Sequence, residues 1–229
     1  MYMIIIIAII LLILITIVIK YNKEGFDNSI TKIIHQTAPN DKSKWPNVWY
    51  KCQESWKKMY PNYKYKLWSD EDLDELIKTQ YPEFYDIYIN YDINMKRIDM
   101  ARYFILYTYG GVYVDMDFIC FKPFLDSLPQ DKVSIVESPW DNETLQNSLM
   151  ISPKHNPFWL KVIEKAKSRL NDDILKSTGP ILISDTYFEN KAMIHILPNE
   201  FYNPKNTTSE VEYTPNDKLI TLHYGTKTW

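Results

Sequence analysis

Two aspartates separated by one residue, Asp115 and Asp117, have the type and spacing that metal chemistry requires. They end the segment GGVYVDMD, in which an apolar stretch after two glycines predicts a buried strand over 112–118. Side chains alternate along a strand, so both carboxylates are expected to face the same side as Tyr113. Two neighbouring buried carboxylates repel each other and lose hydration, and a hard divalent cation relieves both costs. The pair therefore predicts an Mg²⁺ or Mn²⁺ site able to bridge a diphosphate.

A second charged pair is expected to point inward from the preceding helix, which the pattern predicts over 94–109. At 100° per residue, Arg102 falls inside the apolar face of this helix and Asp99 falls at its edge. Charged side chains are rarely buried unless they form ion pairs or take part in binding or catalysis. One interpretation is a structural ion pair between helix and sheet. The other is that Arg102 meets a carboxylate or phosphate, while Asp99 orients it or binds a hydroxyl group.

The elements that must position these residues alternate along the chain. Strands are expected at 31–37, 63–68, 112–118, 133–137, 148–152, 194–197 and 218–223, and helices at 45–60, 69–77, 81–91, 94–109, 155–170 and 181–188. This order predicts an α/β domain with a mostly parallel central sheet, whose ligand crevice lies at the carboxyl ends of the strands. The chain has five glycines and no glycine-rich phosphate motif. A metal is therefore the natural group to neutralise phosphates.

Composition excludes some function classes. The formal net charge is −3 and no run of basic residues occurs, so the chain lacks the electrostatic footprint of a nucleic-acid-binding protein. The two cysteines, Cys52 and Cys120, form neither a disulfide framework nor a zinc-ligand set, and their pairing stays open.

The N-terminus predicts a transmembrane anchor over residues 1–20, followed by a short stem at 21–30 and one catalytic domain at 31–229. The stretch from Tyr2 to Ile19 carries no charge and would span about 27 Å as a helix, close to the thickness of a bilayer core. A cleaved signal peptide would instead have a basic start and small residues at its cleavage site. Lysines after the anchor favour a cytosolic domain, whereas glycosylation sequons at Asn142 and Asn206 permit a lumenal one. The orientation stays open, with a lumenal catalytic domain as the first choice.

Four stretches of the chain, in the same order, are similar to glycosyltransferase family 32. They are KIIHQT at 32–37, SWKKMYPNYKYKLWSDED at 55–72, R-x-D-x-x-R-Y-x-x-L-Y-x-Y-G-G-x-Y-x-D-x-D at 97–117 and H-x5-W from His223 to Trp229. This family includes yeast-type initiating α-1,6-mannosyltransferases and the mannosyltransferases of inositol phosphoceramide. One departure is the closing motif, which in the family is close to H-H-W-x-G-S-W and here reads HYGTKTW.

The resemblance implies a GT-A fold and a role for each matching residue. Asp117 would bind Mn²⁺ or Mg²⁺ directly, Asp115 would contact both the metal and the donor, and His223 would complete the metal shell. The donor site would include Asp99, Arg102, Tyr113 and Trp229, with Arg102 on the diphosphate and Trp229 closing over it.

Two further residues carry open interpretations. Asn147 precedes a predicted strand and is a candidate for binding a sugar, although an ordinary loop asparagine fits equally well. His35 follows the first apolar run and lies either near the base of a nucleotide or, as the preferred interpretation, in the core as a satisfied histidine.

The implied function is a metal-dependent retaining glycosyltransferase. It would move a hexose, with mannose as the first choice, from GDP-mannose or a UDP-hexose to a glycan or lipid acceptor at a membrane of the Golgi or endoplasmic reticulum. The alternatives are a non-catalytic sugar-binding membrane protein and a nucleotide-sugar hydrolase.

Overall fold

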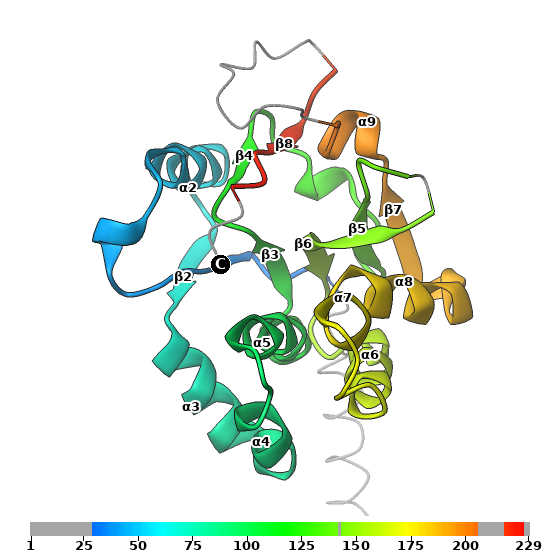
Figure 1. Cartoon of the computed structure of the whole chain (residues 1–229). Helices are drawn as coiled ribbons and strands as arrows, with labels where there is room; N and C mark the ends of the chain where they lie inside the picture. Colours follow the sequence, from blue (N-terminus) through cyan, green and yellow to red (C-terminus); the bar gives the residue numbers. More distant parts are fainter. Residues whose placement is uncertain (1–28, 142, 206–217, 227–229) are drawn as a thin grey trace, which may run out of the picture.

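The computed structural model describes residues 29–141, 143–205 and 218–226 (Figure 1). A six-stranded sheet runs through its centre in the order β2-β1-β3-β6-β5-β7. Three of the five strand pairings in this sheet are parallel, and β6 is the strand that runs against its neighbours. The predicted α/β domain with a mostly parallel central sheet is confirmed.

The strands of this sheet are short, and all but the two edge strands, β2 and β7, are largely buried. They are β1 (Ile33–Thr37), β2 (Lys64–Trp68), β3 (Gly111–Val114), β5 (Val133–Glu137), β6 (Leu145–Ser152) and β7 (Ile194–Leu197). A second, two-stranded antiparallel sheet joins β4 (Phe118–Cys120) to β8 (Thr221–His223). This small sheet brings the C-terminal part of the described chain back beside the end of β3.

One predicted strand is wrong in its extent. Residues 112–118 do not form a single strand, because β3 ends at Val114 and a turn intervenes before β4. The N–H of Phe118 donates to the carbonyl of Asp115 at 3.1 Å, which closes the turn. The two aspartates therefore lie on a turn between two sheets. The alternation of side chains along a strand does not set the direction of their carboxylates there.

The helices begin where the sequence supplies start signals. Ser69 forms a capping box with Asp72, and a proline occupies the first turn of three helices. The helices are α2 (Asn47–Met59), α3 (Asp70–Gln80), α4 (Pro82–Ile89), α5 (Asn94–Tyr109), α6 (Pro157–Lys167), α7 (Ile174–Ser177), α8 (Pro180–Glu189) and α9 (Asn199–Tyr202). The short helices α7 and α9 are additions to the sequence-based prediction.

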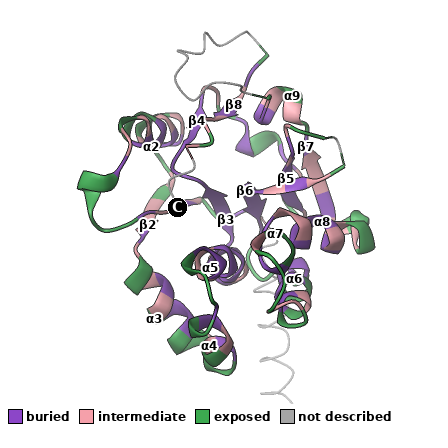
Figure 2. Cartoon of the chain, viewed as in Figure 1, coloured by how far each residue is buried: buried purple, intermediate pink, exposed green. Residues whose placement is uncertain are grey.

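The helices cover both faces of the sheet. Figure 1 shows α3 to α6 on one side, and α2 and α9 on the other. Tyr113 of β3 packs into the core beneath α5, whereas its neighbours Val112 and Val114 pack with Trp56 of α2. Figure 2 shows that the middle of the sheet and the inner side of α5 are largely buried, whereas the edge strands β2 and β7 are partly exposed. The alternation predicted for β3 is thus confirmed up to Val114.

Two glycines make the reversal between α5 and β3 possible. Gly110 and Gly111 have φ angles of 64° and 87°, a region that other residues rarely adopt. A Cβ on Gly110 would also lie 2.6 Å from the backbone nitrogen of Lys154. This tight turn sets α5 directly against β3, so that residues of the helix can meet the aspartates that follow the strand.

Some expectations fall outside the described part of the chain. The predicted anchor at 1–20 and nearly all of the stem at 21–30 lie there, as do Asn142, Asn206 and Trp229. Across the residues that the structure does describe, every helix is too short or too polar to cross a membrane. Cys52 and Cys120 are both buried and carry free thiols, so they do not form a disulfide.

Candidate active site

The turn that carries Asp115 and Asp117 is held in place by its backbone. The N–H of Asp115 donates to the carbonyl of Ser148 on β6 at 2.9 Å. The side chain of Gln36 at the end of β1 donates to the carbonyl of Asp115 at 3.2 Å. These bonds join the turn to the strands on either side of β3, at the carboxyl ends of β1 and β3. The site therefore lies where the predicted crevice of a parallel sheet is expected.

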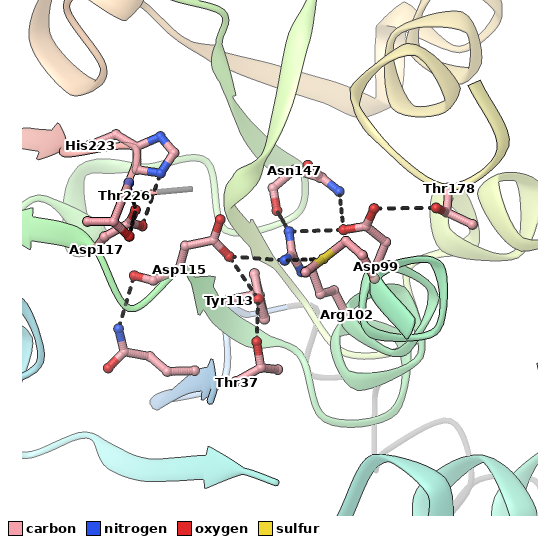
Figure 3. Close-up of polar contacts among 12 residues, drawn as sticks. Thr37, Asp99, Arg102, Tyr113, Asp115, Asp117, Asn147, Thr178, His223 and Thr226 are labelled. Carbon is pink, nitrogen blue, oxygen red and sulfur yellow. Dashed lines mark hydrogen bonds and ion pairs between the residues drawn. The ribbon is translucent and has the colours of Figure 1, made fainter. Parts of the chain in front are cut away.

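Arg102 of α5 connects two buried carboxylates (Figure 3). Its Nη1 lies 3.2 Å from Oδ1 of Asp99, and its Nη2 lies 3.4 Å from Oδ1 of Asp115. All three residues are at most 5% exposed. The predicted inward-facing pair of Asp99 and Arg102 is present, and Arg102 also forms an ion pair with Asp115.

Burial and charge set the ionisation of this group. Burial raises the pKa of Asp99 to about 6, against the opposing attraction of Arg102. Burial also raises the pKa of Asp115, and the neighbouring Asp117 adds to that effect while Arg102 opposes it. Burial opposes the charge of Arg102, but Asp115, Asp99 and the neighbouring tyrosines together outweigh it, so its pKa is raised and Arg102 remains charged. The result is a buried cation that is shared between two acidic groups.

Tyr113 lies behind Asp115 rather than on an exposed surface. It is fully buried, its hydroxyl group donates to Oδ1 of Asp115 at 2.9 Å, and Arg102 stacks over its ring at 4.9 Å. Because the hydroxyl proton of Tyr113 is donated to Asp115, the contact between Tyr113 and Thr37 has Thr37 as the donor, also at 2.9 Å. Tyr113 and Arg102 both contact Oδ1 of Asp115, so Oδ2 takes part in neither contact.

Asp117 is held by the C-terminal segment of the described chain. Nε2 of His223 on β8 lies 3.0 Å from its Oδ1, and the backbone N–H and hydroxyl of Thr226 reach its Oδ2 at 2.7 and 2.9 Å. Burial opposes ionisation of Asp117, but His223 and Thr226 outweigh it and lower the pKa to about 2. Gly225 has a φ angle of 61°, and this turn brings Thr226 back to the carboxylate.

The donor atoms of Asp115, Asp117 and His223 fit a divalent cation. One ligand atom from each lies within 4.8 Å of the others. Two carboxylates and an imidazole suit Mn²⁺, and the carboxylates suit Mg²⁺. Nε2 of His223 is engaged with Asp117, so His223 can serve by orienting that carboxylate as well as by binding the metal itself.

Two cavities meet at the Arg102–Asp115 pair. The larger, of about 550 Å³, extends from the end of β1 past the start of α5 to both aspartates of the turn. The smaller, of about 230 Å³, is lined by Asp99, Asn147, Gly179 and His223 among others. The two cavities share Met95, Arg102, Asp115 and Ile174 as lining residues. A ligand that filled both would therefore pass the predicted metal site.

The structure also shows what holds Asp99. The side-chain amide of Asn147 donates to Oδ1 of Asp99 at 3.0 Å and to the hydroxyl of Tyr103 at 3.2 Å, and its backbone carbonyl accepts from Arg102 at 3.2 Å. Thr178 donates to Oδ2 of Asp99 at 3.3 Å.

Sequence reasoning missed Thr178, Tyr103 and Thr226 as residues of the site. The only signal was Gly225 in HYGTKTW, which indicated a turn before Thr226. Asn147 is on the wall of the smaller cavity, but its amide is used for Asp99.

His35 does not take part in this site. It is fully buried, its Nε2–H donates to the carbonyl of Gly110 at 3.1 Å, and its Nδ1 accepts from the indole of Trp68 at 3.1 Å. Burial lowers its pKa to about 4. The interpretation of His35 as a satisfied core histidine is confirmed.

Comparison with known proteins decides the family. The model of the glycosyltransferase sugar-binding region containing the DXD motif matches residues 46–134, which include the Asp115–Asp117 turn. The chain is 36% identical over 177 residues to inositol phosphoceramide mannosyltransferase 3 of Schizosaccharomyces pombe, covering 72% of this chain and 47% of the relative. It belongs to this family of glycosyltransferases. The resemblance found in the sequence is confirmed.

Two further comparisons concern an initiating mannosyltransferase and a solved structure with a similar fold. The initiation-specific alpha-1,6-mannosyltransferase of Candida albicans is 26% identical, covering 76% of this chain and 56% of that one. The chain thus spans about half the length of these two relatives. The solved structure of the PaToxG glycosyltransferase aligns with a TM-score of 0.58 at 17% identity, covering 76% of this chain and 78% of that one. The chain therefore has a GT-A-like glycosyltransferase fold, as the resemblance implied.

Proposed function

We propose that this chain is a metal-dependent, retaining hexosyltransferase that uses a nucleoside-diphosphate sugar as its donor. The observation that carries the proposal is the Asp115–Asp117–His223 cluster, which lies where two cavities meet beside a buried arginine. The larger cavity would hold the nucleotide and the smaller one the hexose. Their shared lining would then lie beside the diphosphate, where positive charge is needed.

A divalent cation bound by Asp115 and Asp117 would neutralise the charge that develops on the leaving diphosphate. Asp117 suits this role because its pKa of about 2 keeps it ionised over the physiological pH range. Arg102 adds a fixed positive charge beside the same oxygens, in a site from which water is largely excluded. Asp99 and Tyr113 hold the cation of Arg102 and the carboxylate of Asp115 in position.

The residues present favour attack on the donor from the side that the diphosphate leaves. Asp115 and Asp117 serve the metal, and Asp99 serves Arg102, so these carboxylates are not available to form a covalent intermediate. The acceptor oxygen would bond to the anomeric carbon as the carbon–phosphate oxygen bond breaks. The acceptor's proton would pass to the departing diphosphate, and the α configuration would be retained.

The names of the relatives support a choice of donor sugar and of acceptor class for this chain. Both relatives reported above are named as mannosyltransferases, and one of them is named for inositol phosphoceramide. We propose GDP-mannose as the first donor to test, with UDP-hexoses next, and a lipid head group or glycan as the acceptor. An anchor over residues 1–20 would place the domain at a Golgi or endoplasmic reticulum membrane, close to such an acceptor.

The test is release of nucleoside diphosphate by residues 21–229 with Mn²⁺. The donor panel contains GDP-mannose, UDP-glucose, UDP-galactose and UDP-N-acetylglucosamine. We expect one donor to be turned over, and we expect EDTA or Asp117→Ala to abolish turnover. Asp126→Ala is the matched control, because Asp126 is an exposed aspartate in the short 3-10 helix Leu125–Ser127. Full activity of this variant would show that the loss is specific to Asp117.

The opposite result would change the assignment. If no donor is turned over and none binds in a metal-dependent manner, the transferase proposal fails and a sugar-binding role takes its place. If nucleoside diphosphate is released but no acceptor is ever glycosylated, the chain is a nucleotide-sugar hydrolase.

A further inference from the structure

A buried lysine outside the DXD turn contacts a segment of the chain that lines the two cavities. Lys96, in the first turn of α5, is 2% exposed. Its Nζ lies 2.9 Å from Oδ1 of Asp92, 2.8 Å from the carbonyl of Asp172 and 3.5 Å from the carbonyl of Leu170. The three N–H groups of the ammonium thus have three acceptors, which is what a buried lysine requires.

The two carbonyls belong to the segment 170–179, which we call the wall segment. Ile174 lines both cavities, and Leu175 and Gly179 line the smaller one. Half of the wall segment is not held by apolar packing, because residues 171–173 and 175–176 are exposed. A segment of this kind opens easily unless polar contacts hold it.

Polar contacts reach the wall segment at both ends and near its centre. Lys96 holds its beginning through the two carbonyls. At its end, the hydroxyl of Tyr103 donates to the carbonyl of Thr178 at 2.5 Å, and Thr178 donates to Asp99 (Figure 3). The partly buried Arg169 also contacts the carbonyl of Lys176 at 3.4 Å. Lys96 is the buried cation among these contacts, and it lies six residues before Arg102 on the same helix.

We propose that Lys96 is a positioning residue for the donor sugar: α5 uses it to hold the wall segment in place beside Arg102 and Asp115. One helix then sets both the charge that meets the diphosphate and the wall that encloses the hexose. This inference rests on the transferase function proposed above. It predicts that loss of Lys96 weakens donor binding without removing any group that contacts the reacting atoms.

The test compares Lys96→Met with Lys165→Met. Lys165 is also partly buried and pairs with Glu189 at 2.6 Å, joining α6 to α8, but it lines neither cavity. We expect Lys96→Met to raise the KM for GDP-mannose, or for whichever donor of the panel is turned over, about 10-fold. The kcat should stay within about 2-fold, because the metal site and Arg102 are untouched. Lys165→Met should leave both values unchanged.

Amide hydrogen exchange supplies a second readout that does not depend on turnover. In Lys96→Met, exchange should accelerate in residues 170–179 and stay unchanged in α6. Lys96→Arg keeps the positive charge and several donors, so it should restore part of the protection and part of the KM. A purely structural role would instead lower the active fraction, so that kcat falls while KM stays constant.

Each outcome decides the inference. A folded Lys96→Met protein with normal KM and normal exchange in 170–179 overturns it. If Lys96→Met does not fold, Thr178→Val loosens the other end of the wall segment, and a normal KM in that variant overturns the inference instead. If the unaltered protein turns over no donor, the proposed function fails, while the exchange result still shows whether Lys96 holds the wall segment.

Discussion

The two aspartates of the DXD turn, Asp115 and Asp117, lie two residues apart and ionise in opposite surroundings. Asp115 contacts Tyr113 and Arg102, which also pairs with Asp99, and burial raises the pKa of Asp115. Asp117 meets His223 and Thr226, which lower its pKa to about 2 despite its burial. We call these groups the Asp115 half and the Asp117 half of the site.

The halves also differ in where their residues come from. The charged groups of the Asp115 half belong to one continuous stretch, 97–117, because α5 and β3 are joined by the Gly110–Gly111 turn. The Asp117 half needs partners 106 and 109 residues further along, which the pairing of β4 with β8 brings into place. The first half is thus assembled locally and belongs to the core, whereas the second depends on docking of a distant segment.

The largest expected effect is on stability, in the Asp115 half. Arg102→Met leaves two buried carboxylates without their cation and should lower the free energy of unfolding by about 3–5 kcal/mol. Urea denaturation measures this loss. Arg97→Met is the control, because Arg97 lies on the helix surface 3.9 Å from Asp74, and its loss should cost under about 1 kcal/mol. Equal losses in the two variants would show that the Asp115 half is not a core element.

The next effect concerns the turn that supports the Asp115 half. His35 has a pKa of about 4 in the folded protein and about 6.5 when unfolded, so the unfolded chain binds more protons between these values. Its contribution is fully present above pH 6.5 and is lost as the pH falls toward 4, by about 3 kcal/mol in total.

His35→Gln keeps a donor for Gly110 and an acceptor for Trp68 but does not titrate. The unfolding free energy of this variant should therefore decline less steeply than that of the unaltered protein between pH 6.5 and pH 4. Chemical denaturation at a series of pH values measures the difference. Parallel curves for the two proteins would show that His35 is not kept neutral by burial.

In the Asp117 half, the expected effect is on metal binding rather than on folding. His223→Gln removes the ring that orients Asp117 and should weaken Mn²⁺ binding about 10–100-fold. Isothermal titration with Mn²⁺ measures the affinity. His195→Gln, on β7 and away from the cluster, should bind Mn²⁺ normally. A loss of stability as large as that of Arg102→Met would remove the contrast between the halves.

The smallest expected effect separates the backbone of Thr226 from its side chain. Thr226→Val removes the hydroxyl that reaches Oδ2 of Asp117 and leaves the N–H, so Mn²⁺ affinity should fall only about 5-fold. Thr144→Val breaks a similar threonine–aspartate contact, with Asp141 at 2.8 Å, outside the site and should change nothing. A fall as large as that of His223→Gln would place the hydroxyl, rather than the histidine, as the main support of Asp117.

Much of the Asp115 half could be predicted because it depends on local periodicity. The bounds of α5 follow from its apolar spacing and the two glycines, and the inward direction of Arg102 and Asp99 follows from 100° per residue. The same reasoning failed at 115–117, because a turn closed by the bond from the N–H of Phe118 to the carbonyl of Asp115 ends β3 early, and bonds to Gln36 and Ser148 on neighbouring strands hold that turn in place. Those strands are distant in sequence, and no local pattern reports them.

By itself, the sequence determined the family, the order of most helices and strands, the DXD pair and the buried ion pair on α5. The elements, the DXD pair and the ion pair follow from residues within a few helical turns or one strand of one another, and the family follows from four short stretches in a fixed order. Only the tertiary structure decided that Asp117 is held by His223 and Thr226, that Asn147 and Thr178 hold Asp99, and that Lys96 reaches the wall of both cavities. Those contacts join segments 45 or more residues apart, and which of the many polar side chains meet is set by how the helices and the two sheets pack.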